Sequence, residues 1–128
     1  MSVVRDYVII MTLIAVYDSH GQVVGWSQED RLYSLSGEVV GWVRDDAVYA
    51  LHGLHVGWFE NCQYWDSTGN VVAWTEGASG GPAKPGRAGV PGRPGKAGAP
   101  GRPGFSGRMG KPGFSPSWSA KSWRSFLK

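Results

Sequence analysis

The sequence predicts an all-β domain followed by a basic tail, and three observations lead to this prediction. Residues 11–74 consist of four consecutive 16-residue units that align without a gap. Each unit reads as a strand, a tight turn and a second strand. All eight prolines and ten of the 13 basic residues lie after residue 76. We therefore expect four β-hairpins closed into a small, shallow barrel with four-fold symmetry, followed by a disordered Gly/Pro-rich tail.

Charge divides the 128-residue chain at the same place. Residues 1–76 carry ten acidic and three basic side chains, a net charge of −7, whereas residues 77–128 carry ten basic side chains and no acidic one, a net charge of +10. The length allows one modest domain. A tail of this charge favours a polyanionic partner, which is nucleic acid, an anionic lipid surface or an acidic protein. The chain's own acidic domain is the nearest such partner.

Residues 1–10 form an extension ahead of the units. The apolar stretch from Tyr7 to Tyr17 is 11 residues long, too short to span a bilayer but suited to the core of a secretory signal. Against export, Asp6 cancels the charge of Arg5, and cleavage after the stretch would remove a strand of the first unit. We expect a cytoplasmic protein that is at most peripheral at the inner membrane, with Met11 as an alternative start.

The β domain, residues 11–76, is predicted from four positions that recur in every unit. The seventh position is aromatic, the eleventh is glycine, the fourteenth is valine and the sixteenth is tryptophan. In that order, the residues are Tyr17, Tyr33, Tyr49 and Trp65; Gly21, Gly37, Gly53 and Gly69; Val24, Val40, Val56 and Val72; and Trp26, Trp42, Trp58 and Trp74. Rare residues at a fixed spacing indicate one repeated structural motif.

Each hairpin is expected to turn at its glycine. The segments DSHG, SLSG, ALHG and DSTG fit a type I turn that a left-handed glycine and a G1 bulge complete. The side chains of Asp18, Ser34 and Asp66 can accept hydrogen bonds from the turn backbone. The predicted structural turn residues are Gly21, Gly37, Gly53 and Gly69.

This turn sets the predicted pairing across each hairpin. The sixth position is expected to face the fourteenth, as in Val16 opposite Val24, on the same face as the tryptophans. The aromatic residue at the seventh position is expected to cover the small fifteenth residue, as in Tyr17 over Gly25. A single hairpin is marginally stable, so the four are predicted to close around an axis lined by an aromatic ring of Trp26, Trp42, Trp58 and Trp74. An open two-layer meander is the alternative.

The repeated motif Tyr-x3-Gly-x-Val-Val-Gly-Trp, followed by WTEGASGGPAKP, resembles the bacterial 4-fold beta-flower family. The stretch VYALHGLHVGWFENCQYWDSTGNVVAWTEGASGGP and a basic tail that contains SWSAKSW carry the resemblance, which covers nearly the whole chain. It implies a shallow symmetric ring of hairpins with aromatic residues toward the axis. It implies no established activity, so it supplies no catalytic residue. The chain departs from the family in its ten leading residues and in the strict recurrence of glycine in the tail.

Glycine occupies every third residue from Gly86 to Gly113, which is the signature of collagen. The five prolines from Pro91 to Pro112 all stand in the third place of their triplets, however, and six cations in this stretch have no acidic residue to pair with. Three such chains would repel one another strongly. The prediction for residues 77–116 is therefore a disordered basic linker with polyproline-II character, and a collagen-like trimer is the alternative.

Residues 117–128 combine aromatic and basic side chains. Because Trp123, Phe126 and Leu127 share one side of a short helix, the segment is predicted to be an interfacial membrane anchor, with plain disorder as the alternative. The predicted membrane-interface residues are Trp118, Trp123, Phe126 and Leu127. The predicted polyanion-binding residues are Arg87, Arg93, Lys96, Arg102, Arg108, Lys111, Lys121 and Arg124.

The residues that could carry chemistry form no recognisable site. His20 and His52 share a turn position at which two other units carry Ser36 and Thr68, which are poor metal ligands. The single cysteine, Cys62, excludes an internal disulfide bond and reads as a half-buried strand residue. Four carboxylates lack a nucleophile or a convergent base, and these are Glu29, Asp30, Asp45 and Asp46. No catalytic, cofactor-binding or metal-binding residue is predicted.

The sequence favours a binding module without enzymatic activity. The leading hypothesis attaches the basic tail to an anionic membrane surface or an acidic protein, since each basic residue near such a membrane contributes about 1 kcal/mol. One alternative is non-specific nucleic-acid binding by the tail. Another is a structural protein in which a collagen-like trimer displays three β domains. The sequence identifies no small-molecule substrate.

Overall fold

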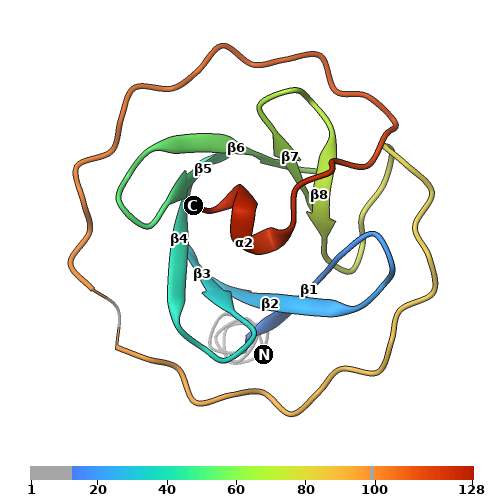
Figure 1. The fold of residues 1–128 in the computed structure, drawn as a ribbon, viewed down its shortest axis with the longest axis horizontal. Helices are drawn as coiled ribbons and strands as arrows, with labels where there is room; N and C mark the ends of the chain where they lie inside the picture. The colour runs from blue at the N-terminus through green and yellow to red at the C-terminus, as the bar shows by residue number, and fades with distance from the viewer. Residues whose placement is uncertain (1–12, 99) are drawn as a thin grey trace, which may run out of the picture.

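The computed structural model describes residues 13–98 and 100–128. Eight antiparallel strands form a closed barrel in which neighbouring strands follow the chain order (Figure 1). The strands are β1 (Ile14–Tyr17), β2 (Val23–Gln28), β3 (Arg31–Ser34), β4 (Val39–Arg44), β5 (Ala47–Ala50), β6 (His55–Glu60), β7 (Gln63–Asp66) and β8 (Val71–Trp74). A short helix, α2 (Trp123–Phe126), follows near the C-terminus. The predicted all-β class is confirmed.

The barrel closes where β8 meets β1. Tyr17 of β1 pairs with Trp74 of β8, and their ring centroids lie 4.9 Å apart. The indole Nε1 of Trp74 also donates a hydrogen bond of 2.8 Å to the carbonyl oxygen of Asp18. Closure removes the open sheet edges that a meander of hairpins would expose. The predicted closed arrangement is therefore the one that forms.

Each hairpin turns through its glycine. Gly53 has a φ of +100°, and its N–H donates a hydrogen bond of 2.9 Å to the carbonyl oxygen of Ala50. The equivalent glycines Gly21, Gly37 and Gly69 have φ values between +78° and +99°. A residue with a Cβ would lose roughly 1–2 kcal/mol in this left-handed conformation. The carboxylates of Glu29, Asp30, Asp45 and Asp46 belong to the tight turns that connect one hairpin to the next.

The pairing across each hairpin differs from the predicted register by one residue. Val16 lies opposite Gly25, and Tyr17 lies opposite Val23, so that Val24 is an extra residue in β2. The other three hairpins show the same shift between the sixth and seventh positions. The prediction was wrong because it placed the bulge at the turn glycine. In the structure, the bulge falls between the pairs formed by the sixth and seventh positions. As a result, the sixth position faces the small fifteenth residue.

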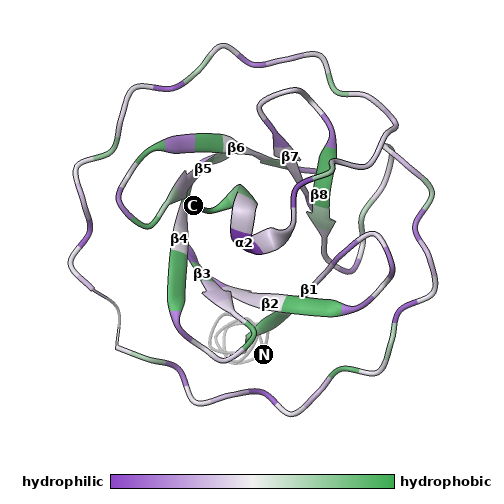
Figure 2. Cartoon of the chain, viewed as in Figure 1, coloured by the Kyte–Doolittle hydropathy of each residue, from purple (hydrophilic) through white to green (hydrophobic). Residues whose placement is uncertain are grey.

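The sheet separates two sets of apolar side chains. The inner set surrounds α2, which lies at the centre of the ring of strands in Figure 1. It comprises Val16, Leu32, Val48, Tyr64, Val72 and Ala73 from the barrel and Trp123, Phe126 and Leu127 from the C-terminal segment. Figure 2 shows the hydrophobic residues concentrated on the strands and at the end of α2. The axis of the barrel is therefore filled by a different part of the chain from the one predicted.

The tryptophans at the sixteenth position lie on the outer face of the sheet. Trp26 and Trp42 belong to a buried cluster with Tyr17, Tyr33 and Tyr49, apart from the cluster around α2. Side chains alternate between the faces of a strand, so a residue next to the inward fifteenth position points outward. The predicted ring of tryptophans around the axis is therefore wrong. These side chains are nevertheless buried, with Trp26 at 0% exposure, because the tail covers them.

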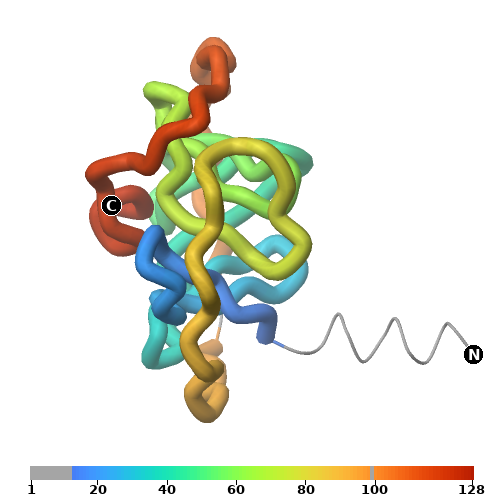
Figure 3. Tube along the Cα trace, turned by 90° about the vertical axis from the view of Figure 1, so that its right-hand side faces the viewer, coloured from blue at the N-terminus to red at the C-terminus, as the bar shows by residue number. Residues whose placement is uncertain are grey.

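The tail encircles the barrel instead of forming a separate disordered segment. Residues 84–98 and 100–119, which we call the belt, run around the outside of the ring of hairpins (Figures 1 and 3). At regular intervals a belt N–H donates a hydrogen bond to the carbonyl oxygen of a turn glycine. These bonds are Ala88 to Gly21 (2.8 Å), Ala97 to Gly37 (3.0 Å), Ser106 to Gly53 (2.9 Å) and Ser115 to Gly69 (2.9 Å).

The four donors are spaced by nine residues, and the belt sequence itself repeats with this period. The belt consists of the segments KPGRAGVPG, RPGKAGAPG, RPGFSGRMG and KPGFSPSWS. Each belt segment therefore corresponds to one 16-residue hairpin unit. Disorder was predicted because the prolines stand in the third place of each triplet and the cations have no acidic residue within the tail to pair with. Only the three-residue glycine period was considered, and nine is a multiple of three. The nine-residue period is the sequence signal for the belt, and the three-residue glycine period conceals it.

Each belt segment also covers the aromatic residues of the outer face. Its first residue places a cation over an aromatic ring, with Arg93 at 5.6 Å from the centroid of Trp26 and Arg102 at 5.7 Å from that of Trp42. In three segments the fourth residue packs on the seventh-position aromatic. Arg87 lies over Tyr17, Phe105 lies 4.6 Å from Tyr49, and Phe114 stacks on Trp65 with centroids 4.2 Å apart. A cation–π contact contributes about 0.5–2 kcal/mol, depending on desolvation. Because such contacts recur from one segment to the next, they hold the belt in one register.

The belt glycines face open space, unlike the glycines of collagen. A Cβ added to any glycine from Gly86 to Gly113 would meet no atom within 4 Å. A Cβ at Gly53, by contrast, would collide with the carbonyl oxygen of Gly104. We therefore expect Gly107→Ala to leave the thermal unfolding temperature unchanged or raise it slightly. We expect Gly53→Ala to lower the stability by about 2 kcal/mol, because it adds left-handed strain and displaces the belt.

Thermal unfolding followed by circular dichroism checks this pair of variants. A triple helix requires glycine at every third residue, so a large loss of stability in Gly107→Ala would contradict the belt and favour the collagen-like trimer.

Candidate functional site

The C-terminal helix α2 begins with a capping box. The Ser122 side chain accepts a hydrogen bond from the N–H of Ser125, and the Ser125 side chain accepts one from the N–H of Ser122. This cap fixes the start of a helix that is only four residues long. Trp123, Phe126 and Leu127, predicted as membrane-interface residues, are 2–5% exposed because they enter the barrel. That prediction is corrected: their shared apolar side packs against the inner face of the sheet.

Missing side chains in the barrel make room for α2. A Cβ at Gly25 would collide with the indole of Trp123, and one at Gly57 would lie 2.7 Å from the ring of Phe126. The indole Nε1 of Trp123 donates a hydrogen bond of 3.2 Å to the carbonyl oxygen of Tyr33. The small fifteenth residues therefore accommodate the helix, and the prediction that seventh-position aromatics cover them is wrong. Trp118, the fourth predicted membrane residue, forms an isolated bridge with Val71 and is half-buried.

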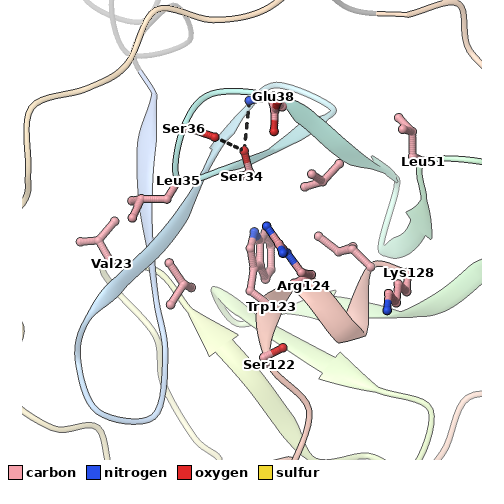
Figure 4. A pocket seen from close by; sticks show the side chains of 13 residues that line it. Val23, Ser34, Leu35, Ser36, Glu38, Leu51, Ser122, Trp123, Arg124 and Lys128 are labelled. Atoms are coloured by element: carbon pink, nitrogen blue, oxygen red, sulfur yellow. Dashed lines mark hydrogen bonds between the residues drawn. The ribbon is translucent and has the colours of Figure 1, made fainter.

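A cavity of about 680 Å³ opens beside α2 at one mouth of the barrel (Figure 4). Half-buried valines and buried residues of the C-terminal segment form much of its lining, and these are Val23, Val24, Val40, Trp123 and Leu127. Leu35 and Leu51 stand at its edge and are 48% and 41% exposed. The cavity arises because one short helix fills only part of the barrel mouth.

The exposed leucines break the repeat. They occupy the ninth position of the second and third units, where the first and fourth units carry Ser19 and Ser67. Both carbonyl oxygens accept a hydrogen bond from a tryptophan, with Trp26 donating to Leu35 at 3.0 Å and Trp42 to Leu51 at 3.1 Å. These bonds fix the backbone of the two turn tips while the side chains remain in solvent. Alignment of the four units shows this difference at the ninth position. Its relevance follows only from the structure, which places that position beside a cavity.

Two cations and one carboxylate also border the cavity. Arg124 and Lys128 are exposed residues of the C-terminal segment, and Glu38 lies on the β3–β4 turn. Figure 4 shows the Arg124 side chain extending over the opening between Trp123 and the β3–β4 turn. No acidic side chain within the described ranges lies within 4.0 Å of the charged groups of Arg124, Lys128 or Lys121. The mouth therefore carries positive charge beside an apolar surface.

The other predicted polyanion-binding residues face the barrel. Arg102 pairs with Asp30, Lys111 pairs with Glu60, and Arg87 lies 3.2 Å from Glu76. Arg108 pairs with Asp46. Arg93 donates to the carbonyl oxygen of Leu13 at 2.8 Å, and Lys96 donates to the side chain of Gln28 at 2.6 Å. Each exposed ion pair is worth little alone, but together they direct the belt's charge toward the acidic domain.

His55 is a functional candidate that sequence reasoning did not single out. It is 2% exposed, its Nδ1 accepts a hydrogen bond of 2.8 Å from the N–H of Met109 in the belt, and its Nε2 lies 2.8 Å from the carbonyl oxygen of Gly57. A neutral ring with its proton on Nε2 satisfies both contacts. Burial lowers the pKa of His55 and Arg108 adds to this effect, while the Gly57 carbonyl and Asp46 oppose it. His55 therefore fastens the belt only when it is uncharged.

The described residues contain neither a potential metal-binding cluster nor a helix suited to cross a membrane. Within residues 13–98 and 100–128, no group of three or more His, Cys, Asp and Glu side chains is placed to hold a metal ion. None of the helices in that part of the chain is long and apolar enough to cross a membrane. Cys62 is a free, half-buried thiol as predicted, but it lies in the β6–β7 turn and not on a strand.

Comparison with known protein families gives a match over most of the chain. A family model described as "4-fold beta flower protein" matches residues 14–127, which include the barrel, the belt and α2. Neither the curated proteins nor the solved structures contain a significant match. The family model therefore extends over the tail as well as the barrel.

The His55 contact predicts how stability depends on pH. The folded-state pKa lies below the ordinary value of 6.5, so the unfolded chain binds the proton more readily. The contribution of His55 to stability is therefore complete above pH 6.5 and decreases as the pH falls from there through the folded-state pKa. We expect the unfolding temperature to decrease between pH 7 and pH 5, and His55→Gln to reduce that decrease. His52→Gln is the matched control at an exposed turn, and a pH dependence unchanged in His55→Gln would contradict this assignment.

Proposed function

We propose that this chain, which belongs to the 4-fold beta flower family, is a non-enzymatic binding module that attaches to an anionic membrane surface through the barrel mouth beside α2. One observation carries the proposal. Two exposed leucines, Leu35 and Leu51, border the same opening as Arg124 and Lys128. Apolar side chains that insert between lipids, combined with cations that remain at the headgroups, are typical of proteins that bind membrane surfaces.

The expected affinity is low. Complete burial of a leucine side chain contributes about 1.5–3 kcal/mol, so each of these half-exposed side chains adds about 1 kcal/mol on insertion. Each cation near an anionic leaflet adds about 1 kcal/mol. Two leucines and two cations together provide about 4 kcal/mol, comparable to weak, reversible anchoring. Binding should therefore be sensitive to salt and should require anionic lipid.

The charge distribution supports the mouth over the belt as the attachment surface. The belt cations face aromatic rings and carboxylates of the barrel, as Arg102 does with Trp42 and Asp30. The chain's own acidic domain thus pairs with these cations, in the place of a separate polyanionic partner. It also weakens the case for nucleic-acid binding by the belt, since the same groups would have to leave the barrel to contact phosphates.

Liposome flotation of the full chain tests the proposal. We expect the protein to float with vesicles of phosphatidylcholine and phosphatidylglycerol at low salt, and to remain unbound with phosphatidylcholine alone or at 0.5 M salt, where screening is nearly complete, with a Debye length of roughly 4 Å. The double variant Leu35→Ser/Leu51→Ser should lose binding tenfold or more. Leu54→Ser is the matched control, because Leu54 is 52% exposed but does not border the cavity. No flotation at low salt, or an equal loss in Leu54→Ser, would contradict the proposal.

A further inference from the structure

We infer that the cavity beside α2 binds a single-chain amphiphile with a carboxylate head, such as a fatty acid. This inference rests on the proposed role of the barrel mouth at a membrane surface, because it takes the anionic lipid component as the source of the ligand. Its basis is the coincidence of an open apolar cavity with two cations at its rim, Arg124 and Lys128.

The size and lining of the cavity suit one aliphatic chain. Its volume of about 680 Å³ lies within the range of about 300–1,000 Å³ that holds small molecules. Val24 and Val40 line it from strands β2 and β4, and Leu127 lines it from the C-terminal segment. Leu35 and Leu51 extend this apolar wall to the opening. An acyl chain would remove these surfaces from water without displacing any polar partner, so the hydrophobic effect favours its entry.

The rim suits a single negative charge. The Arg124 guanidinium can hold a carboxylate in a two-pronged hydrogen bond, and Lys128 adds a second positive charge. Glu38 borders the same opening and repels additional negative charge, so a monoanion is favoured over a highly charged headgroup. The hydroxyls of Ser34 and Ser36, 3.1 Å apart, also border the opening and offer polar contacts. The resulting ligand has an apolar chain inside and one carboxylate at the rim.

Isothermal titration calorimetry with the full chain and decanoate below its micelle concentration tests the inference. We expect saturable binding with one site per chain. Decanol, which has the same chain without the charge, should bind at least tenfold more weakly, and decyltrimethylammonium should show no saturation. Arg124→Gln should remove most of the preference for decanoate over decanol. Lys121→Gln is the matched control, since Lys121 is exposed but does not line the cavity.

A pair of repeat-related variants tests the location. Val40 and Val56 occupy the fourteenth position of neighbouring units, and both are half-exposed and pack on the inner cluster, but only Val40 lines the cavity. Val40→Phe should weaken decanoate binding at least tenfold, whereas Val56→Phe should leave it unchanged. Leu51→Gln supplies a second test at the rim. Because Leu51 is exposed, this substitution should not destabilise the fold, and we expect it to weaken decanoate binding threefold or more.

The outcomes separate this inference from the proposed function. Saturable decanoate binding that depends on Val40 and Arg124 supports the inference even if vesicles do not bind, in which case the membrane proposal fails. Vesicle binding without decanoate binding overturns the inference and leaves the membrane proposal standing. Decanoate binding that Val40→Phe and Val56→Phe reduce equally would also overturn it, because the ligand would then lie elsewhere.

Discussion

The hydrogen bond from a belt N–H to the carbonyl of a turn glycine is the contact on which the rest of the structure depends. At Gly21, Gly37, Gly53 and Gly69 the backbone of the belt approaches so closely that a Cβ would not fit. Only a left-handed glycine can both close the hairpin and leave this space. The same residue therefore terminates a strand and positions the belt, which in turn covers the aromatic outer face. Removing the belt would expose that face to water.

The bulge in each hairpin has a second consequence, inside the barrel. Because it shifts the pairing by one residue, the small fifteenth position points inward and leaves space at the axis. Gly25, Gly41 and Gly57 have no side chain to fill that space, and α2 occupies it instead. The helix is too short to fill the whole mouth, and the cavity beside it follows. The candidate site thus results from a mismatch between a four-fold barrel and a single helix.

The sequence predicted the hairpins, the turn glycines and closure of the sheet, because glycine and tryptophan recur in a fixed register. It did not predict the side of the sheet that the tryptophans occupy, since a one-residue bulge reverses the result. The belt was missed because a nine-residue period is contained in the glycine period. The sequence identified the shared apolar side of Trp123, Phe126 and Leu127. It did not identify the surface that they pack against, because glycines without side chains form much of that surface. The edge of the cavity was missed as well, because it is formed in part by Leu35 and Leu51, which depart from the repeat.

Amide hydrogen exchange of the full chain, followed by NMR, tests the central claim that the tail is a belt in register with the hairpins. The structure predicts protected amides at Ala88, Ala97, Ser106 and Ser115, which are spaced by nine residues. The other amides between Ala88 and Ser106 should exchange faster, whereas Met109, which donates to His55, should also be protected. A tail that is free in solution would exchange at the rate of an unfolded chain at all four positions. That result would contradict the belt and the burial of the outer aromatic face.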